Sequence, residues 1–552
     1  MKNHSLIYSP VGGAGEIGMN MYAYGFKSQN KVTYILVDAG VSFPKMDLEP
    51  GVDLIFPNPK IILNNLSVLE GIFITHAHED HLGAIGFVAS KIDCKIYCRK
   101  FTSEIVKDKL NKVNVSSKRV VTVKEWPFEV KLKNASVSFF PTTHSVPEAS
   151  FLIIKSEFGV ALHTGDFKID KSPILEKPID YKKLGNALGG RPSLCVVDST
   201  NMLNKNEGKS ESLLEESIYK VINESKGRIV FTSFASNIGR LKIIADAGKK
   251  SGRSIAVFGR AMNNMLSKAI ETGILTDFPN LIDPRKAHLI PRENLLVIAT
   301  GSQGETRAAS AQLSRGKYMG LEIQNGDTFV FSSKTIPGNE IAVNRVINNL
   351  SEKGVAVIYS DDREFHVSGH TNIPEMMDFY KKIKPKLVVP MHGEIRHLIG
   401  HKKILDEKKI RAEIVRNGEI VEIDKDLNIR NDSSNRPEKL FVDGRIIAKS
   451  DNFAFRERIR MSSEGLVVIL ISNRKAKKNL HIQFTSFGLP RFEDYSDELK
   501  SNAEVYLNKI ANKKEMNKLD EFERFIKEDI YSICGKKPII TIAETESKTY
   551  FA

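Results

Sequence analysis

Cysteine is scarce in this sequence, with four residues among 552, at Cys94, Cys98, Cys195 and Cys534. Cys94 and Cys98 lack the spacing of zinc or redox motifs, and so few thiols exclude a disulfide-based scaffold. Long apolar runs are also missing, because the most evident run near the C-terminus, Gly465–Ile471, is far too short to span a bilayer. The N-terminus has no apolar core of the kind found in signal peptides. We therefore expect a cytoplasmic protein with no membrane partner.

Acidic residues are outnumbered, with 67 aspartates and glutamates against 81 lysines and arginines and a net charge of +14. Such an excess favours a polyanionic partner such as nucleic acid or anionic lipid, with a general solubility charge as the alternative explanation. The hydrophobic fraction of 41% is ordinary for a globular protein. A chain of this length predicts two to four domains with an ample core.

One short segment carries three histidines and an aspartate, at His76, His78, Asp80 and His81. The apolar run Gly71–Ile74 just before it predicts a buried strand. Residues two apart on an extended chain point to the same side, so His76 and His78 can approach one metal ion together. Asp80 and His81 lie where the chain turns toward a helical pattern, and they can face a second ion. Imidazole nitrogen and carboxylate oxygen without thiolate suit Zn²⁺ or Mn²⁺. The alternative interpretation is a histidine-rich surface loop.

This segment resembles the His-x-His-x-Asp-His signature of the metallo-β-lactamase superfamily. Three other residues, each after a predicted strand, resemble the rest of that superfamily's pattern. Asp38 resembles the carboxylate that braces the ligands from behind, His144 resembles a further ligand, and Asp166 resembles the carboxylate that bridges two metals. Taken singly, His144 is more often an ordinary loop histidine and Asp166 a turn former. Their order along the chain, each after a strand, favours metal binding.

A second set of motifs resembles the β-CASP nucleases. Asp198, His370 and His392 match motifs A, B and C of that family. Members with valine at the motif C position tend to act on DNA and those with histidine on RNA, so His392 favours RNA. Further segments, Gly12–Asn20 and Phe234–Ile238 among them, are similar to the ribonuclease J family, and this similarity spans nearly the whole chain.

The resemblance implies an α/β fold, namely a metallo-β-lactamase αββα sandwich with an inserted α/β β-CASP domain and a small C-terminal α/β domain. Clean strand–helix alternation between about 210 and 355 independently favours such an insert. A polar, turn-rich stretch after residue 430 predicts a linker. The expected boundaries are 1–208 and 359–430 for the metallo-β-lactamase domain, 209–358 for the insert, 431–448 for the linker and 449–552 for the C-terminal domain.

The resemblance also implies two divalent metal ions, zinc or manganese, with magnesium usable in an assay. One ion would be held by His76, His78, His144 and Asp166. The other would be held by Asp80, His81, Asp166 and His392, with Asp38 and Asp198 supporting the ligands from behind. The metals would activate a hydroxide that attacks the scissile phosphate. The catalytic candidates are Asp80, His81 and His370. His370 either assists the transition state, protonates the leaving group or only orients a ligand.

The implied substrate is single-stranded RNA, especially with a 5′-monophosphate end. The family is expected to cleave it in both 5′→3′ exonucleolytic and endonucleolytic modes, in mRNA decay and rRNA maturation. The candidate RNA-binding residues, whose N–H groups and hydroxyls can hold phosphates, are Ala235, Ser236, Asn237, His366, Val367, Ser368, Gly369 and His370. Ordinary turn formation is the alternative for these residues. The resemblance further implies a homodimer or homotetramer and RNA-degradation partners.

Other functions stay open at this point. A DNA nuclease or another phosphodiesterase can use the same scaffold, with His392 arguing against DNA. The long insert and the basic charge argue against a small-molecule hydrolase of the lactonase or thioesterase type. A catalytically silent RNA-binding scaffold is disfavoured because all seven metal positions carry competent side chains. Gly13–Gly18 fits the G-x-G-x-x-G pattern, but a strand is predicted after it, so no helix N-terminus is offered to a dinucleotide.

Overall fold

The computed structural model describes residues 5–28, 31–44, 48–60, 69–359, 365–434, 437–449, 453–473, 480–510 and 515–545. The chain divides into two compact units. Unit 1 comprises Met1–Ser42 and Phe56–Lys439, and unit 2 comprises Phe43–Ile55 and Leu440–Ala552. Every residue of the candidate site belongs to unit 1, so the fold of unit 1 is what positions the chemistry.

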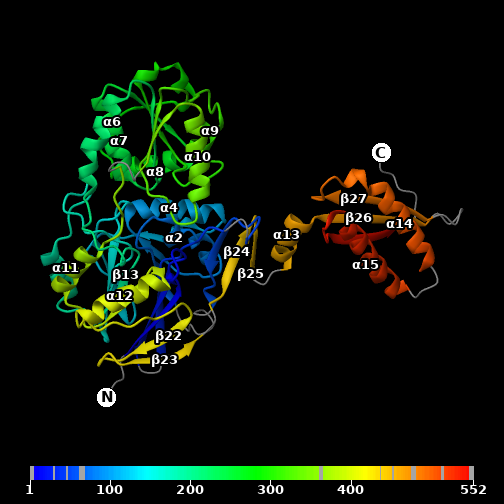
Figure 1. Cartoon of the computed structure of the whole chain (residues 1–552). Helices are drawn as coiled ribbons and strands as arrows, with labels where there is room; N and C mark the ends of the chain where they lie inside the picture. The colour runs from blue at the N-terminus through cyan, green and yellow to red at the C-terminus, as the bar shows by residue number, and fades with distance from the viewer. Residues whose placement is uncertain are drawn as a thin grey trace. The chain divides into compact units, whose positions relative to one another are not determined.

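Two large sheets form the core of unit 1 (Figure 1). The first has eight strands, in the order β23 (Ile429–Ser434), β22 (Glu419–Ile423), β1 (Ser5–Gly12), β3 (Met21–Ser28), β4 (Lys31–Val37), β6 (Leu69–Phe73), β7 (Ile96–Cys98) and β8 (Val120–Thr122). The second has six, in the order β20 (Val388–Met391), β13 (Leu194–Asp198), β12 (Gly159–His163), β11 (Ser150–Ser156), β10 (Ala135–Pro141) and β9 (Val130–Lys131).

The two sheets face each other through one apolar cluster that takes residues from both, including the buried Phe73, Phe139 and Val196. Each such side chain contributes about 1.5–3 kcal/mol when it leaves water. Successive residues of a strand point to opposite faces, so Cys195 and Val197 pack outward against α5 (Tyr181–Leu188), α11 (Ile373–Ile383) and α12 (Ile395–Glu407). The first sheet carries α2 (Glu79–Leu82), α3 (Ile85–Ala89) and α4 (Lys100–Lys112), of which α4 contacts β7 and β8. This is the expected αββα arrangement.

The insert is a parallel sheet of six strands, in the order β16 (Leu281–Ile282), β15 (Ser254–Phe258), β17 (Leu295–Ala299), β14 (Ile229–Thr232), β18 (Thr328–Phe331) and β19 (Ala356–Ile358). Its helices are α6 (Leu214–Glu224), α7 (Ile238–Lys250), α8 (Arg260–Glu271), α9 (Ala309–Arg315) and α10 (Glu340–Glu352). In Figure 1, α6 and α7 lie on one side of this sheet and α9 and α10 on the other. Val230 and Phe329 pack with the α9 and α10 side in one buried cluster.

Unit 2 contains a three-stranded sheet in the order β27 (Leu480–Phe487), β26 (Leu466–Asn473) and β28 (Ile539–Thr545). Its buried cluster joins the sheet to α14 (Ser496–Lys509) and α15 (Glu515–Cys534), with Ile469, Leu499 and Phe522 fully buried. β26 contains all but the first residue of the apolar run Gly465–Ile471. Among the described residues, no helix is long and apolar enough to cross a membrane.

The segment predicted to be a linker, 431–448, contains strands. It includes the end of β23, most of β24 (Lys439–Asp443) and most of β25 (Ile446–Lys449), and β24 and β25 form an antiparallel hairpin. Val442 is buried, and its carbonyl accepts the Asp53 N–H at 2.8 Å. Local composition predicts the turns of this segment. It does not predict the bond from Asp53, which lies far away in the sequence. Residues 435 and 436 lie outside the described residues.

Candidate metal centre

The loops that carry the predicted ligands all begin at the same ends of their strands. β4 and β6 run parallel in the first sheet, and β12, β13 and β20 run parallel in the second. β10 shares the direction of β12, because both are antiparallel to β11. The carboxyl ends of such strands lie at one edge of a sheet, where ligand-binding loops gather in open α/β sheets. Asp38, His76, His144, Asp166 and His392 follow the ends of β4, β6, β10, β12 and β20.

The first group of candidate ligands is His76, His78, His144 and Asp166, with one ligand atom from each within 4.8 Å of the others. His144 Nε2 lies 3.1 Å from His78 Nδ1. One oxygen of Asp166, Oδ2, lies 3.8 Å from His76 Nε2 and 3.8 Å from His144 Nε2. Three imidazoles and one carboxylate thus converge on a common point.

The second group is Asp80, His81, Asp166 and His392, within the same 4.8 Å limit. The other oxygen of Asp166, Oδ1, lies 3.2 Å from His81 Nε2 and 2.5 Å from His392 Nδ1. Asp80 Oδ2 lies 3.4 Å from His392 Nε2 and 3.6 Å from His81 Nε2. Asp166 therefore faces one group with each of its oxygens, as a carboxylate shared between two cation sites must.

Asp38 fixes the ring of His81 from behind. His81 Nδ1 lies 2.8 Å from Asp38 Oδ2, and both side chains are fully buried. The Thr75 N–H donates to Asp38 Oδ1 at 2.8 Å, and the Thr75 hydroxyl donates to Oδ2 at 2.9 Å. A carboxylate at Nδ1 keeps the proton on that nitrogen and leaves the Nε2 lone pair for a cation. Asp38 and His392 both have positive φ, 61° and 47°, a strained conformation for non-glycine residues that the surrounding contacts must hold in place.

The donor set passes a test for a bound cation. Among the described residues, His76 Nε2 and His392 Nε2 are buried without a hydrogen-bond partner. Such atoms are costly to bury unless a ligand occupies them. Nitrogen and oxygen donors without thiolate fit a divalent cation such as Zn²⁺ or Mn²⁺. A divalent metal is therefore what these residues are suited to hold.

Burial and mutual charge leave His76, His78 and Asp166 in the forms that metals require. Burial, followed by the charge of His81, lowers the pKa of His76 well below its ordinary value. Burial also lowers the pKa of His78 to about 4. Burial alone would raise the pKa of Asp166, but His392 and His81 hold it well below its usual range. Burial would lower the pKa of His392, but Asp166 and Asp80 raise it to about 10. A cation that binds there must displace this proton.

His370 lies beside the two groups and pairs with Asp198. Its Nδ1 is 2.7 Å from Asp198 Oδ2, and these two residues form a third group with Asp166 and His392. Burial would lower the pKa of His370, but Asp198 raises it above the ordinary value. His144 Nδ1 lies 2.6 Å from the Gly369 carbonyl, so the segment before His370 also orients a candidate ligand.

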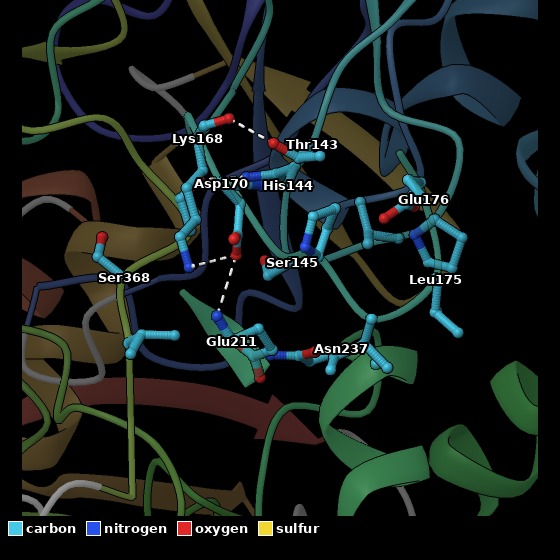
Figure 2. Close-up of a pocket in the computed structure, with 17 residues that line it drawn as sticks. Thr143, His144, Ser145, Lys168, Asp170, Leu175, Glu176, Glu211, Asn237 and Ser368 are labelled. Atoms are coloured by element: carbon cyan, nitrogen blue, oxygen red, sulfur yellow. Dashed lines mark hydrogen bonds and ion pairs between the residues drawn. The ribbon is translucent and has the colours of Figure 1, made fainter. Parts of the chain in front are cut away.

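A pocket adjoins the centre between the sheets and the insert. Its lining includes Thr143, His144, Lys168, Asn237, Val367, Ser368 and Gly369. Figure 2 shows Thr143, His144 and Lys168 on one side and Asn237 beside the first turn of α7. Of the predicted RNA-binding residues, Asn237 and 367–369 line this pocket, whereas Ala235, Ser236 and His366 do not. His370 lies with the metal groups.

Sequence reasoning missed several residues that hold the site. Asn201 Nδ2 contacts Ser368 Oγ at 2.7 Å and the His370 carbonyl at 3.1 Å. Its place three residues after Asp198 was the only signal. Arg240, fully buried on α7, donates to Glu211 and to the Phe365 carbonyl, and nothing local to its helix indicates this. Asn20 Nδ2 lies 3.0 Å from His81 Nε2, although the sequence marks Asn20 only as the end of the similar segment Gly12–Asn20.

Family models match the parts of the chain in the order that the fold presents them. Residues 33–196 match a model described as "Beta-lactamase superfamily domain". Residues 226–350 match "Ribonuclease J, beta-CASP domain", and residues 363–415 match "Zn-dependent metallo-hydrolase RNA specificity domain". The fold and the site therefore define a metallo-hydrolase with a β-CASP insert, which confirms the predicted fold class.

Relatives of known name extend the similarity to nearly the full chain. The chain is 32% identical to "Ribonuclease J" of Sinorhizobium meliloti over 99% of its own length and 98% of the relative's. It is 37% identical to "Ribonuclease J 1" of Streptococcus pyogenes over 83% of its length and 81% of the relative's. A solved protein of unknown function from Enterococcus faecalis is similar in fold, with a TM-score of 0.55 and 15% identity over 76% of this chain and all of that one. The chain belongs to the ribonuclease J family. Membership confirms the prediction of a hydrolytic ribonuclease.

Proposed function

We propose that this chain is a metal-dependent RNA phosphodiesterase with 5′→3′ exonuclease and endonuclease activity, acting in mRNA decay and rRNA maturation. The observation that carries the proposal is the pair of ligand groups that share Asp166 at the side of a pocket lined also by the insert. Two neighbouring sites for divalent cations, next to a pocket that can take an RNA phosphate, suit the hydrolysis of phosphodiester bonds. The net charge of +14 suits the same substrate.

We assign His76, His78, His144 and Asp166 to one divalent ion, zinc or manganese, and Asp80, His81, Asp166 and His392 to another. When bound, such ions supply Lewis acidity toward the scissile phosphate and toward the attacking water. The protein's part is to keep Asp80 and Asp166 ionised and His76 and His78 neutral. Asp38 holds His81 in the tautomer that presents Nε2.

His370 is assigned the proton transfer to the leaving oxygen. Asp198 accepts from its Nδ1, which raises the pKa of the imidazole and directs Nε2–H toward the leaving oxygen as a donor. Asn201 holds the carbonyl of the same residue and the hydroxyl of Ser368, so the backbone around His370 is fixed.

The pocket residues are assigned to the RNA. Lys168 lines the pocket and supplies a positively charged ammonium group, which lies 3.2 Å from Asp170. Asn237, Ser368 and Gly369 supply amide, hydroxyl and backbone groups of the kind that hold phosphates. Single-stranded RNA with a 5′-monophosphate is the substrate we expect, with a homodimer or homotetramer as the assembly and other RNA-degrading proteins as partners. The four free cysteines suit the reducing cytoplasm.

A cleavage time course tests the proposal. RNA of one sequence, labelled at a 5′-monophosphate or 5′-triphosphate end, is incubated with the enzyme and Mn²⁺ or Mg²⁺, beside a matched DNA. The test variant is Asp80→Ala/His81→Ala. The control is Asp93→Ala/His288→Ala, which removes the same residue types from exposed positions.

We expect labelled mononucleotide from monophosphate RNA and longer fragments from internal cuts. Both products should vanish in the test variant and after chelation, and Mn²⁺ should restore the chelated wild type. The control variant should match the wild type. Cleavage that survives chelation, or a preference for the DNA, would overturn the proposal.

A further inference from the structure

The glycine-rich turn Gly13–Gly18 lies directly against the second ligand group. It follows β1, whose direction equals that of β4 because both are antiparallel to β3. Within the turn, Ala14 and Gly15 pair with Gly393 and Glu394, the residues after His392. A side chain at Gly18 would come within 3.8 Å of Asp80 Cβ. The G-x-G-x-x-G motif, which a strand follows in place of a helix, therefore packs around two candidate metal ligands.

Asn20, at the end of this turn, is tied to the ligand loop through its backbone. Its N–H donates to the Asp80 carbonyl at 3.0 Å, and its own carbonyl accepts the Gly40 N–H at 2.9 Å. The side chain is fully buried. Asn20 thus has little freedom to move relative to Asp80.

The side-chain amide points into the second group. Asn20 Nδ2 lies 3.4 Å from Asp80 Oδ2 and 3.0 Å from His81 Nε2. The Tyr22 hydroxyl donates to Asn20 Oδ1 at 2.7 Å. A hydroxyl proton at Oδ1 selects the amide orientation that turns Nδ2 toward Asp80. Flipping the amide would put its oxygen against the Asp80 carboxylate, which is unfavourable.

Gly13 makes room for this arrangement. A Cβ there would lie 2.3 Å from the Tyr22 hydroxyl and 2.4 Å from Asn20 Oδ1. Any larger residue would therefore displace the bond between Tyr22 and Asn20. Gly13 also has a φ of 86°, which glycine adopts without strain.

We propose that Asn20 is a positioning residue for Asp80, that Tyr22 fixes its amide, and that this pair sets the metal affinity of the second ligand group. The proposal rests on the proposed function only in that this group takes a divalent cation. A fixed N–H holds one oxygen of Asp80 in place, so the carboxylate is ordered before a cation arrives. Groups that orient metal ligands in this way typically change metal affinity by about 10- to 100-fold when they are removed.

Three tyrosine-to-phenylalanine variants test this, since each removes one buried hydroxyl from the same sheet. Tyr22→Phe removes the bond to Asn20. Tyr24→Phe removes a hydroxyl that lies 2.9 Å from Nδ1 of His163, which is not one of the candidate ligands. Tyr8→Phe removes a hydroxyl that has no partner among the described residues. The measurements are zinc and manganese content of the purified full-length protein and affinity by competition with a chelator.

Wild type, Tyr24→Phe and Tyr8→Phe should each hold two ions with similar affinities. Tyr22→Phe should keep one ion and bind the other about 10- to 100-fold more weakly. Equal affinities in Tyr22→Phe and Tyr24→Phe would refute the positioning role. If Tyr22→Phe does not fold, Asn20→Ser, measured in the same way, decides the question by the same criterion. A wild type that never binds a second ion would overturn the proposed function. That result differs from the one that refutes the positioning role of Asn20, in which the wild type binds two ions and Tyr22→Phe binds them equally well.

Discussion

Replacing Arg240 with methionine should loosen both segments that connect the insert to the rest of unit 1. Arg240 is fully buried on α7. Its Nε donates to Glu211 Oε1 at 2.5 Å, just before the insert's first helix. Its Nη1 donates to the Phe365 carbonyl at 2.8 Å, just after the insert, and to the Ser332 carbonyl at 2.9 Å. One guanidinium therefore holds the chain where it enters and where it leaves the insert.

The expected loss follows from what Arg240→Met leaves behind. Glu211 is only 15% exposed, so its carboxylate would stay largely buried without its cation. Removing one partner of a buried ion pair costs about 3–5 kcal/mol. The Phe365 carbonyl keeps the Ser332 hydroxyl at 2.7 Å as a donor, which places the cost toward the lower end of that range. Glu211→Gln keeps an acceptor for the guanidinium and should cost less, about 1–3 kcal/mol.

Hydrogen exchange read by mass spectrometry is the assay. A loss of 3 kcal/mol or more in local opening should speed exchange at 365–370 by about 100-fold or more. Arg253→Met is the matched control. Arg253 is also buried, but it donates to the carbonyls of Gly227 and Leu295 inside the insert. It should speed exchange near those residues and leave 365–370 unchanged. If residues 365–370 exchange in Arg240→Met at the same rate as in the wild type, Arg240 does not hold this segment and the reasoning is refuted.

Two further predictions concern protons. Asp198→Asn removes the charge that raises the pKa of His370, so a smaller fraction of His370 is protonated at neutral pH. The variant should therefore cleave RNA more slowly than the wild type at neutral pH, and the difference should become smaller as the pH falls. A pH–rate profile with the wild-type shape contradicts this. Burial lowers the pKa of His401 to about 3, and its value in the unfolded chain is about 6.5. The native state thus binds fewer protons between these values, and the free energy of unfolding falls by up to about 1.4 kcal/mol per unit as pH drops below 6.5. His401→Gln should lower the difference in denaturant midpoint between pH 7 and pH 5, and an unchanged difference argues against a neutral buried histidine.

The regular elements of the insert were predictable because their signals are local. The sequence predicts a helix at 238–250 and a strand at 254–258, and the structure has Ile238–Lys250 and Ser254–Phe258. Apolar periodicity inside each segment suffices for this. The short strands β24 and β25 pair with each other, but the polar, turn-rich composition of this stretch predicts only a linker.

The convergence of the candidate metal ligands was predictable for a related reason. His76, His78, Asp80 and His81 lie in one segment, and each remaining candidate ligand follows a strand whose apolar pattern is plain. The RNA-binding residues were also predicted from short segments, but a pocket is lined by segments that lie far apart in the sequence. Asn237 lines the pocket and the adjacent Ala235 and Ser236 do not, which no pattern in the sequence distinguishes.

Asp38 and Asp198 were predictable from the resemblance, but Asn20 and Arg240 were not, because each joins segments far apart in sequence. Asn20 reaches Asp80, 60 residues away, and Arg240 reaches Phe365, 125 residues away. The ligands themselves come from both sheets, since Asp80 and His81 follow β6 whereas Asp166 and His392 follow β12 and β20. A cation held by all four would bind the folded sandwich and not the unfolded chain, so its affinity adds directly to the stability of that packing. Short motifs thus predict which residue types bind the metal. The metal affinity of the site depends in addition on how firmly the two sheets and the turn at Asn20 hold those residues at the distances that a cation requires.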